Sequence, residues 1–344
     1  MNISAVIPTR NRPESLRRTL VSLAAQAHPL KEVLIIDAGD RPLDAGALRR
    51  EFPSLNMIHL TAQPWLCRQR NTGIREASSP YIFLCDDDIE LPREYVATLA
   101  AYLQAHPQAG AVSGLIAEAG LQGQPAFEFP APSFGQLLWN FLFQLTVWGD
   151  VSRVPAPAGA AWFLKLIRKF YAARGNTFTL AGWPLLSRFD SPAFDAAVYG
   201  LGASIIRRDW LLQSPYDEIL DPHGIGDNYG AALGFPGKTP VTVLTGTAAL
   251  HHKSGENRLH PALTYFRRLL ALHYFMVKSP RFSRLNRLFL GWSLLGNLLA
   301  QLLRGETLLA RATLAALKYI LSGRNPYLLA WRRKEKGPLS PAPD

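Results

Sequence analysis

Three consecutive acids, Asp86, Asp87 and Asp88, are the residues of this chain best suited to do chemistry. They directly follow Tyr81–Cys85, a short uncharged apolar run that is typical of a strand buried on both faces of a parallel sheet. Such sheets bind ligands just outside the carboxyl ends of their strands. Because neighbouring carboxylates repel one another, this position favours a bound cation, and hard oxygen ligands suit Mg²⁺ or Mn²⁺. A solvated acidic turn is the alternative.

The apolar pattern around the triplet predicts the elements that position it. Over residues 1–118, short apolar runs alternate with segments whose apolar residues recur at helical spacing. The strand candidates are 3–7, 33–36, 57–60 and 81–85, and the helix candidates are 16–27, 68–77 and 93–105. Since crossovers between parallel strands are right-handed, this βαβ rhythm predicts a parallel sheet with the triplet at its carboxyl edge.

The rest of the chain divides into three further segments. Residues 119–198 form a stretch containing Pro and Gly, which we interpret as an insertion near the site. Its two aromatic patches fit either an ordinary core or a contact with an acceptor or a membrane. Residues 199–260 return to strand patterns at 203–206 and 241–244, and helical patterns dominate 261–344.

The composition indicates a globular protein with an affinity for anionic partners. The 344 residues are 48% hydrophobic and carry a net charge of +11. Residues 280–344 hold 11 Lys or Arg against three acids, so the basic character lies in the C-terminal part, which suggests a membrane surface or an anionic ligand. With only Cys67 and Cys85, we expect no disulfide framework and a reducing cytoplasm. We also expect no signal peptide at the start.

One helical segment has the composition of a helix that lies in a membrane interface. Residues 288–303 contain no charged residue, but these 16 positions fall short of the roughly 20 needed to cross a bilayer. A polar stripe and flanking arginines accompany it, namely Ser293, Asn297 and Gln301 with Arg281, Arg284, Arg287 and Arg304. We expect the basic helices of 261–344 to hold the chain at an anionic membrane surface. A helix buried in a bundle is the alternative.

Four motifs occur in the order that is typical of one enzyme family. They are Ala5–Arg12 (AVIPTRNR), Leu34–Asp37 (LIID), Arg70–Gly73 (RNTG) and Phe83–Asp88 (FLCDDD). Together they resemble the family 2 glycosyltransferases, strongly over residues 1–118 and moderately over 199–256. The resemblance implies a GT-A fold, with a mixed, mostly parallel sheet flanked by helices and a helical C-terminal extension. It also implies a nucleotide-sugar donor, bound by 1–118, and Mg²⁺ or Mn²⁺ as cofactor.

The resemblance also implies a role for each donor-side residue. The positions that would line the nucleotide are Pro8, Thr9, Arg12, Asp37, Arg70, Asp86 and Asp87. Asp37 would accept a hydrogen bond from a pyrimidine base, Arg70 would face the base or diphosphate, and Asp86 would hold the ribose. Asp88 would bind the metal together with Asp86. Taken alone, Thr9 and Asp37 better fit capping or turn roles, and it is their shared sheet edge that favours the site.

The acceptor-side half, 199–260, carries three further motifs that resemble the family. They are Gly200–Arg208, Tyr216–Glu218 and Gly226–Tyr229. In the family, a Glu-Asp pair in the last motif supplies the catalytic base, whereas in this chain Asn228 would occupy that position and could not accept a proton. We therefore predict Asp227 as the base, because an inverting displacement needs a carboxylate near the acceptor hydroxyl. Asp217 and Asp221 are the alternatives.

Two histidines and several missing motifs narrow the prediction. His251 and His252 follow the strand candidate 241–244, and related enzymes have a histidine near here that reaches the metal or diphosphate. Imidazole suits Mn²⁺, so both are predicted metal ligands of equal rank, with a hydrogen-bonded turn as the alternative. The chain lacks the Gln-x-x-Arg-Trp segment of processive synthases, which favours transfer of a single sugar. It also lacks a phosphate loop and a dinucleotide fingerprint.

These features predict a metal-dependent, inverting glycosyltransferase of polysaccharide biosynthesis in the cell envelope. It would move one sugar from a UDP- or dTDP-sugar to a hydroxyl of a glycan or lipid-linked acceptor. We expect it in the cytoplasm, peripheral on the inner face of the cell membrane, with no nucleic-acid partner. The alternatives are a polyprenyl-phosphate glycosyltransferase and, in another class, an inactive scaffold that binds membranes or nucleic acid.

Overall fold

The computed structural model describes residues 1–119, 125–126, 131–253, 255–256 and 258–335. The chain forms two compact units, one built from residues 1–128 with 190–258 and the other from 129–189 with 259–344. Residues 120–124 and 127–130 of the predicted insertion, and 336–344 of the predicted helical segment, lie outside the described residues.

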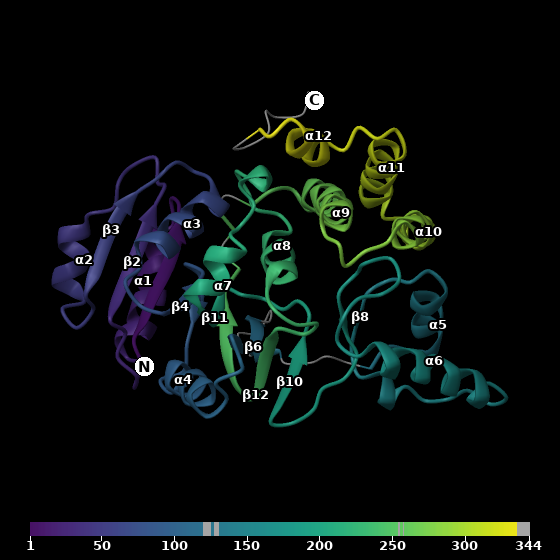
Figure 1. The fold of residues 1–344 in the computed structure, drawn as a ribbon, viewed down its shortest axis with the longest axis horizontal. Coiled ribbons are helices and arrows are strands. Elements are labelled where there is room, and N and C mark those ends of the chain that lie inside the picture. The colour runs from purple at the N-terminus through teal and green to yellow at the C-terminus, as the bar shows by residue number, and fades with distance from the viewer. Residues whose placement is uncertain (120–124, 127–130, 254, 257, 336–344) are drawn as a thin grey trace. The chain divides into compact units, whose positions relative to one another are not determined.

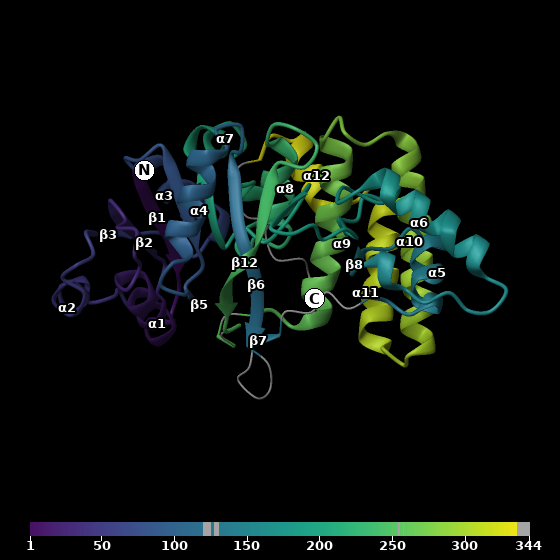
Figure 2. The same cartoon turned by 90° about the horizontal axis from the view of Figure 1, so that it is seen from below.

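The first unit contains the sheet that positions the acidic triplet (Figure 1). Its strands, in spatial order, are β10 (Ala193–Ala196), β12 (Val241–His251), β6 (Ala111–Ala119), β11 (Ala203–Arg207), β4 (Tyr81–Cys85), β1 (Ile3–Thr9), β2 (Glu32–Asp37) and β3 (Met57–Thr61). Strands β4, β1, β2 and β3 run parallel, and β6 and β12 run parallel side by side (Figure 2). Strand β11 is antiparallel to both of its neighbours. The expected mixed, mostly parallel sheet is thus confirmed.

Helices cover both faces of this sheet because its central strands are apolar on both sides. Every residue of β1 and β2 is buried. On one face, α1 (Pro13–Ala24) and α4 (Tyr95–Ala105) pack against one set of alternate strand residues. On the other, α3 (Leu66–Glu76) approaches so closely that a side chain at Gly73 would collide with Val6. The glycine of the RNTG motif is therefore explained by packing.

Helix α3 is tied to the strand ends by the buried side chain of Gln69. Its amide donates hydrogen bonds to the carbonyl of Thr9 at 3.0 Å and to that of Ile36 at 2.7 Å. Both carbonyls lie near the carboxyl ends of their strands. Asp221 caps the N-terminus of α3, since its carboxylate accepts from two amide N–H groups of the first turn. These bonds fix α3 against the sheet edge that carries the triplet.

Several elements of the first unit escape the sequence pattern. Strand β6 is interrupted by Ser113 and Gly114, so its apolar run is not recognisable. Residues 193–196, which the sequence assigns to the insertion, form the edge strand β10. The remaining elements are α2 (Ala45–Glu51), α7 (Arg208–Gln213), α8 (Asp227–Gly234), η2 (Glu218–Leu220), β5 (Ile89–Glu90) and β7 (Pro125–Ala126). All six predicted strands are present.

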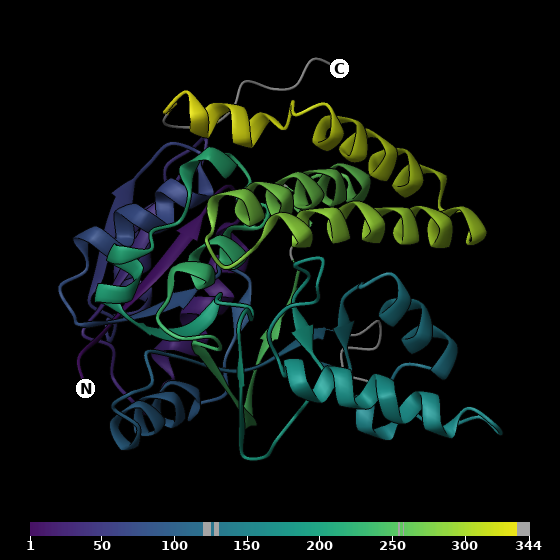
Figure 3. The ribbon, with the colours of Figure 1, turned by 45° about the vertical axis from the view of Figure 1, so that its right-hand side comes forward.

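The second unit is mainly helical, in agreement with the expected C-terminal extension. Helices α9 (Pro261–Lys278), α10 (Arg284–Leu303), α11 (Thr307–Leu321) and α12 (Pro326–Arg332) lie together (Figure 3). A separate apolar core joins α5 (Phe134–Leu142), α6 (Ala161–Arg174), η1 (Val151–Arg153), β8 (Val147–Trp148) and β9 (Leu185–Leu186). Among the described residues, no helix has the length and hydropathy needed to cross a membrane.

The polar stripe of α10 faces the interior of the second unit. Ser293 is fully buried and accepts a hydrogen bond from Trp183 Nε1 at 2.6 Å. Gln301 is also buried and accepts from Thr313 Oγ1 at 2.7 Å. The leucines on the opposite side of the helix are exposed. This helix is therefore packed in a bundle. It buries the polar stripe together with Leu290 and Leu294 and leaves a row of other leucines exposed.

Replacement of Gln69 tests the anchoring of α3. Gln69→Met keeps the side-chain length but leaves two buried carbonyl groups without their donor, so the free energy of unfolding should fall by about 1–3 kcal/mol. Urea denaturation followed by circular dichroism measures this change. Gln104→Met, at an exposed position of α4, is the matched control and should shift stability by less than about 0.5 kcal/mol. Equal stabilities of the two variants would contradict the anchoring role.

Candidate functional site

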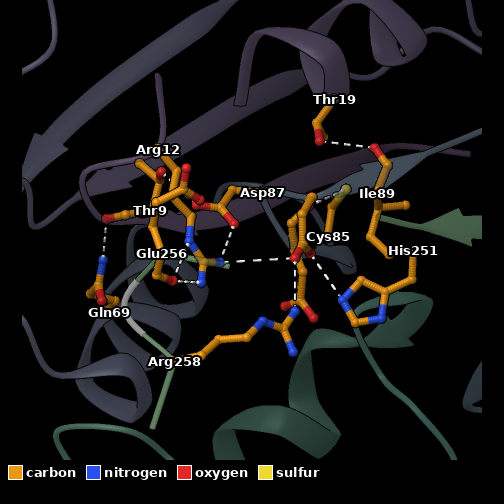
Figure 4. Close-up of polar contacts among 12 residues, drawn as sticks. Thr9, Arg12, Thr19, Gln69, Cys85, Asp87, Ile89, His251, Glu256 and Arg258 are labelled. Atoms are coloured by element: carbon orange, nitrogen blue, oxygen red, sulfur yellow. Dashed lines mark hydrogen bonds and ion pairs between the residues drawn. The ribbon is translucent and has the colours of Figure 1, made fainter. Parts of the chain in front are cut away.

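The carboxyl ends of β1 and β4 bring Thr9 beside the acidic triplet. The two strands are adjacent and parallel, so the residues that end or follow them share one edge of the sheet. Thr9 Oγ1 donates to Asp87 Oδ2 at 2.7 Å, and Arg12 donates to Asp87 Oδ1 at 3.1 Å. Burial raises the pKa of Asp87 to about 6, although both hydrogen bonds oppose the rise. Figure 4 shows Thr9 and Arg12 converging on Asp87.

Asp88 is a buried carboxylate surrounded by cationic groups. His251, the last residue of β12, places Nε2 3.1 Å from Asp88 Oδ1. Arg258 and Arg12 approach Asp88 Oδ2 at 3.3 and 3.9 Å. Burial lowers the pKa of His251, but the hydrogen bond and negative charge of Asp88 outweigh this effect and raise it. Three regions of the chain, which carry Arg12, His251 and Arg258, thus meet at the carboxylate of Asp88.

Asp88 and His251 have a spacing that fits a divalent cation. Two adjacent ligands of an octahedral ion with bonds of about 2.1 Å lie about 3 Å apart, close to the 3.1 Å between Asp88 Oδ1 and His251 Nε2. Within the part of the chain that the structure describes, no three His, Cys, Asp or Glu side chains converge on one point. Mg²⁺ is commonly held by one or two protein ligands with substrate phosphates supplying the others. The residues present fit that mode of binding.

The other two predicted metal ligands make different contacts. His252 Nε2 lies 2.8 Å from Glu90 Oε2, so the two histidines are directed to different carboxylates. Asp86 Oδ1 accepts a hydrogen bond from Arg70 at 2.7 Å. Consecutive side chains at a strand end point in opposite directions, which separates His251 from His252 where sequence spacing could not.

Arg70 links the triplet to the predicted base. Its guanidinium donates to Asp86 Oδ1 and to Asp227 Oδ2 and stacks 5.1 Å above the ring of Tyr216. Arg70 is 5% exposed and Asp227 is 8% exposed. Burial raises the pKa of Asp227, and the charge of Arg70 opposes that rise. A carboxylate with a raised pKa is a stronger proton acceptor than an ordinary aspartate.

Residues of the neighbouring motifs fix this bridge. Asn71 donates to the backbone O of Tyr216 at 2.8 Å and accepts from its N–H at 2.9 Å. Gly202 lies against Asp86 so closely that a side chain there would overlap the carboxylate. Gly226, with a φ of 94°, adopts the left-handed conformation that leads into α8. Each motif thus contributes a residue whose type is set by a close contact or a turn.

The remaining donor-side predictions fall on residues held by local structure. Asp37 accepts hydrogen bonds from the N–H groups of Gly39 and Leu43 at 2.8 and 2.9 Å, and it lies 3.2 Å from His59. These bonds are those of a turn-forming acid, the alternative role that sequence leaves open. Pro8 is buried within β1. A contact of either residue with a nucleotide stays a prediction.

Both alternatives to Asp227 act as caps. Asp217 accepts from the N–H of Ile219 at the start of η2, and Asp221 caps α3. Burial raises the pKa of Asp221 to about 6, even though the two backbone hydrogen bonds oppose it. The carboxylates of Asp217 and Asp221 are thus bonded to helix ends. Of the three candidates for the base, Asp227 is the one that contacts Arg70 beside the triplet.

Two residues to which the sequence assigned no role of their own take part in the cluster. Arg258 contacts Asp88, and Tyr216 supplies the ring on which Arg70 stacks. Arg12 also donates to the carbonyl of Glu256, which connects the turn after β1 to the segment that carries Arg258 (Figure 4). The basic residues that follow the histidine pair indicate that this segment could contact an acidic site. The sequence does not predict the path of the loop, so it does not predict which carboxylate these residues contact.

Removing the charge of Arg70 tests the bridge. Arg70→Met leaves Asp227 buried without its cation, so the free energy of unfolding near pH 8 should fall by about 3–5 kcal/mol. The deficit should shrink toward about pH 5, because the raised pKa of Asp227 lets the folded variant take up a proton and lose the buried charge. Urea unfolding at both pH values measures it. Arg68→Met, at an exposed arginine of the same helix, is the control. A deficit that is independent of pH would argue against a buried charge.

Comparison with known proteins identifies the N-terminal part of the chain. Residues 4–128 match the family described as Glycosyl transferase family 2. Over 89 residues the chain is 39% identical to the uncharacterized glycosyltransferase YwdF of Bacillus subtilis (strain 168), which covers 26% of this chain and 33% of YwdF. The matched stretch thus spans one third of the length of that relative.

Two solved proteins share the fold. The structure of S. aureus TarS 1–349 has a TM-score of 0.54 at 14% identity, covering 97% of this chain and 92% of that one. The same protein in complex with UDP-GlcNAc gives a TM-score of 0.52, also at 14% identity. GalNAc-T7, solved with UDP, GalNAc and Mn²⁺, gives 0.51 at 14% identity, covering 84% of this chain and 53% of that one. Identities this low support the fold alone.

The family match covers Thr9, the triplet and helix α3 with Arg70, and the structural matches extend over nearly the whole chain. The resemblance that the ordered motifs indicate is therefore confirmed. We conclude that the chain adopts the GT-A fold and that residues 4–128 match the family 2 glycosyltransferases.

Proposed function

We propose that this protein transfers a single sugar from a UDP- or dTDP-sugar to a hydroxyl of a glycan or lipid-linked acceptor, with inversion at the anomeric carbon. The observation that carries the proposal is the bridge of Arg70 between Asp86 and Asp227. It joins a carboxylate proposed for the donor to the proposed base. The complex of TarS with UDP-GlcNAc, a protein of similar fold, supports a uridine nucleotide as donor.

The donor side would be recognised through fixed hydrogen-bond donors. Arg12 and Arg258 surround Asp87 and Asp88, and guanidinium groups suit phosphate oxygens because they can donate two parallel hydrogen bonds. In this proposal Thr9 and the arginines contact the nucleotide, while Asp86 accepts from the ribose. Negative charge grows on the diphosphate as it leaves, so preorganised cationic groups at this position lower the barrier.

We further propose that Asp88 and His251 hold Mg²⁺ or Mn²⁺ together with the diphosphate. Their 3.1 Å spacing and the chemistry of an oxygen and an imidazole donor support this assignment. When bound, such a cation supplies Lewis acidity at the leaving diphosphate. The Mn²⁺ in the GalNAc-T7 structure is consistent with a metal in this fold. Asp86, which contacts Arg70, and His252, which contacts Glu90, would then act beside the ion rather than on it.

On the acceptor side, Asp227 would serve as the general base. The acceptor hydroxyl loses its proton to the Asp227 carboxylate while its oxygen forms a bond to the anomeric carbon. The bond from that carbon to the diphosphate oxygen breaks on the opposite face, so one displacement inverts the configuration and releases the nucleoside diphosphate. Arg70 holds Asp227 in place and limits the rise of its pKa, which favours the ionised carboxylate that accepts the proton.

The basic C-terminal helices support a peripheral position on the inner face of the cell membrane, where a lipid-linked acceptor would be available. The nearest rival is a polyprenyl-phosphate glycosyltransferase, because an anionic phosphate acceptor needs no base. A rival in another class is an inactive scaffold, which Asn228 and the positive charge would suit.

Substitution of Asp227 separates these possibilities. Asp227→Asn should lower the rate of UDP release from UDP-GlcNAc with alkyl glycoside acceptors by about 10²–10⁴-fold, since the base is removed. Calorimetric binding of UDP should change little, because an amide retains the shape of the side chain. A coupled assay for UDP measures the rate, and other UDP- and dTDP-sugars are tested in parallel.

Asn228→Asp is the matched control for that experiment. It adds a carboxylate at the neighbouring position and should leave the rate equal to or above that of the wild type. Full activity of Asp227→Asn with a polyprenyl-phosphate acceptor would favour the first rival. Absence of nucleotide binding by the wild type would favour the scaffold.

A further inference from the structure

The outer side of α10 is a row of large apolar side chains exposed to solvent. Its members recur every three or four positions and are between 38% and 81% exposed, namely Leu285, Leu288, Trp292, Leu295, Leu299, Leu302 and Leu303. Leu142, at the end of α5, is 51% exposed and accepts a hydrogen bond at its backbone O from Trp292 Nε1 at 2.8 Å. We call these eight residues the α10 face. Contiguous apolar surface of this kind marks an interaction site.

Close contacts lock this orientation of α10. Gly296 lies against Phe143 so tightly that any side chain there would overlap the ring. Ser293 bonds Trp183, and Gln301 bonds Thr313, both on the buried side. A helix on a protein that meets only water normally turns its polar side outward. Here Ser293, Gly296 and Gln301 are fitted to the interior beside Leu290 and Leu294, so the leucines of the α10 face are left for a partner that is itself apolar.

The charges around the α10 face select among apolar partners. Arg281 and Arg284 are exposed at its N-terminal end and Arg304 is exposed at its C-terminal end, while α10 itself contains no Asp or Glu. A second copy of the face, paired parallel or antiparallel, would bring arginines near arginines, because residues 279–306 hold four arginines and one acid, Glu306. Anionic lipid headgroups complement both ends.

We propose that the α10 face docks on an anionic lipid bilayer, with the helix parallel to the surface and its leucines in the interface. Helices that bind in this way combine an apolar side with flanking basic residues. Trp292 suits the same depth, because its ring is half-exposed while its indole N–H is already bonded. The inference makes specific the membrane position proposed above, and it does not depend on transferase activity.

Vesicle flotation of the full chain tests the docking. Vesicles of phosphatidylcholine mixed with phosphatidylglycerol should carry the wild type upward, and Leu288→Gln/Leu302→Gln should lower the partition coefficient by about 100-fold, since each substitution removes one inserted leucine. Pure phosphatidylcholine or high salt should weaken binding of the wild type. The matched control is Val21→Gln/Leu212→Gln, which changes two apolar residues of similar exposure in the first unit and should float like the wild type.

Equal flotation of wild type and Leu288→Gln/Leu302→Gln would overturn the proposal. The proposal would also be overturned, in favour of self-association, if the wild type does not float but sediments as a dimer while Leu288→Gln/Leu302→Gln sediments as a monomer. Calorimetric titration of UDP into these proteins keeps the two proposals apart. Flotation that is lost in the double variant supports docking even if neither protein binds UDP. The absence of UDP binding would count against the proposed transferase function and not against the docking.

Discussion

Arg70 places one buried positive charge between two carboxylates that come from distant parts of the chain, and the geometry of the site depends on this arrangement. Asp86 follows β4 and Asp227 begins α8, so the guanidinium joins the end of a central strand to the start of a distant helix. Two carboxylates so close together would otherwise repel, and burial of either one unpaired is costly. Helix α3 must therefore carry Arg70 to a fixed point, which Gly73 and Gln69 achieve through packing and hydrogen bonds.

The need to pair each buried carboxylate also explains the contacts of the acidic triplet. Asp86 pairs with Arg70, Asp87 with Thr9 and Arg12, and Asp88 with His251 and Arg258. Each carboxylate thus has its own partner from a different element, although the three acids are adjacent in sequence. A nucleotide diphosphate carries the charge that the arginines complement, so ligand binding at this edge would exchange protein carboxylates for phosphate oxygens around the same cations.

The order of motifs predicted the sheet and the position of the triplet because both follow from unbroken apolar runs. Tyr81–Cys85 could be recognised as a buried strand. Strand β6 could not, because polar residues and glycine interrupt its apolar run. Strand β10 could not either, because it lies in a segment without a regular apolar pattern. The role of Asp221 as a cap of α3, and the carboxylates that His251 and His252 each contact, depend on residues far apart in sequence.

Helix α10 illustrates a different limit. Its periodicity correctly separates a polar stripe from an apolar side, but periodicity alone does not say which side is buried. Contacts such as that of Gly296 with Phe143 decide the question, and they involve a segment of the chain that the pattern leaves unassigned. The structure buries the polar stripe and leaves one row of leucines exposed, and that row is the basis for the proposed docking surface.

The central claim is that the carboxyl edge of the sheet binds a pyrimidine nucleotide diphosphate through a cation held at Asp88. Calorimetric titration of UDP into the wild type and into Asp88→Ala, each with and without Mn²⁺, tests it most directly. The account predicts cation-dependent binding of UDP that is lost in Asp88→Ala, with GDP bound more weakly. Binding that is equally tight without Mn²⁺, or unchanged in Asp88→Ala, would contradict it.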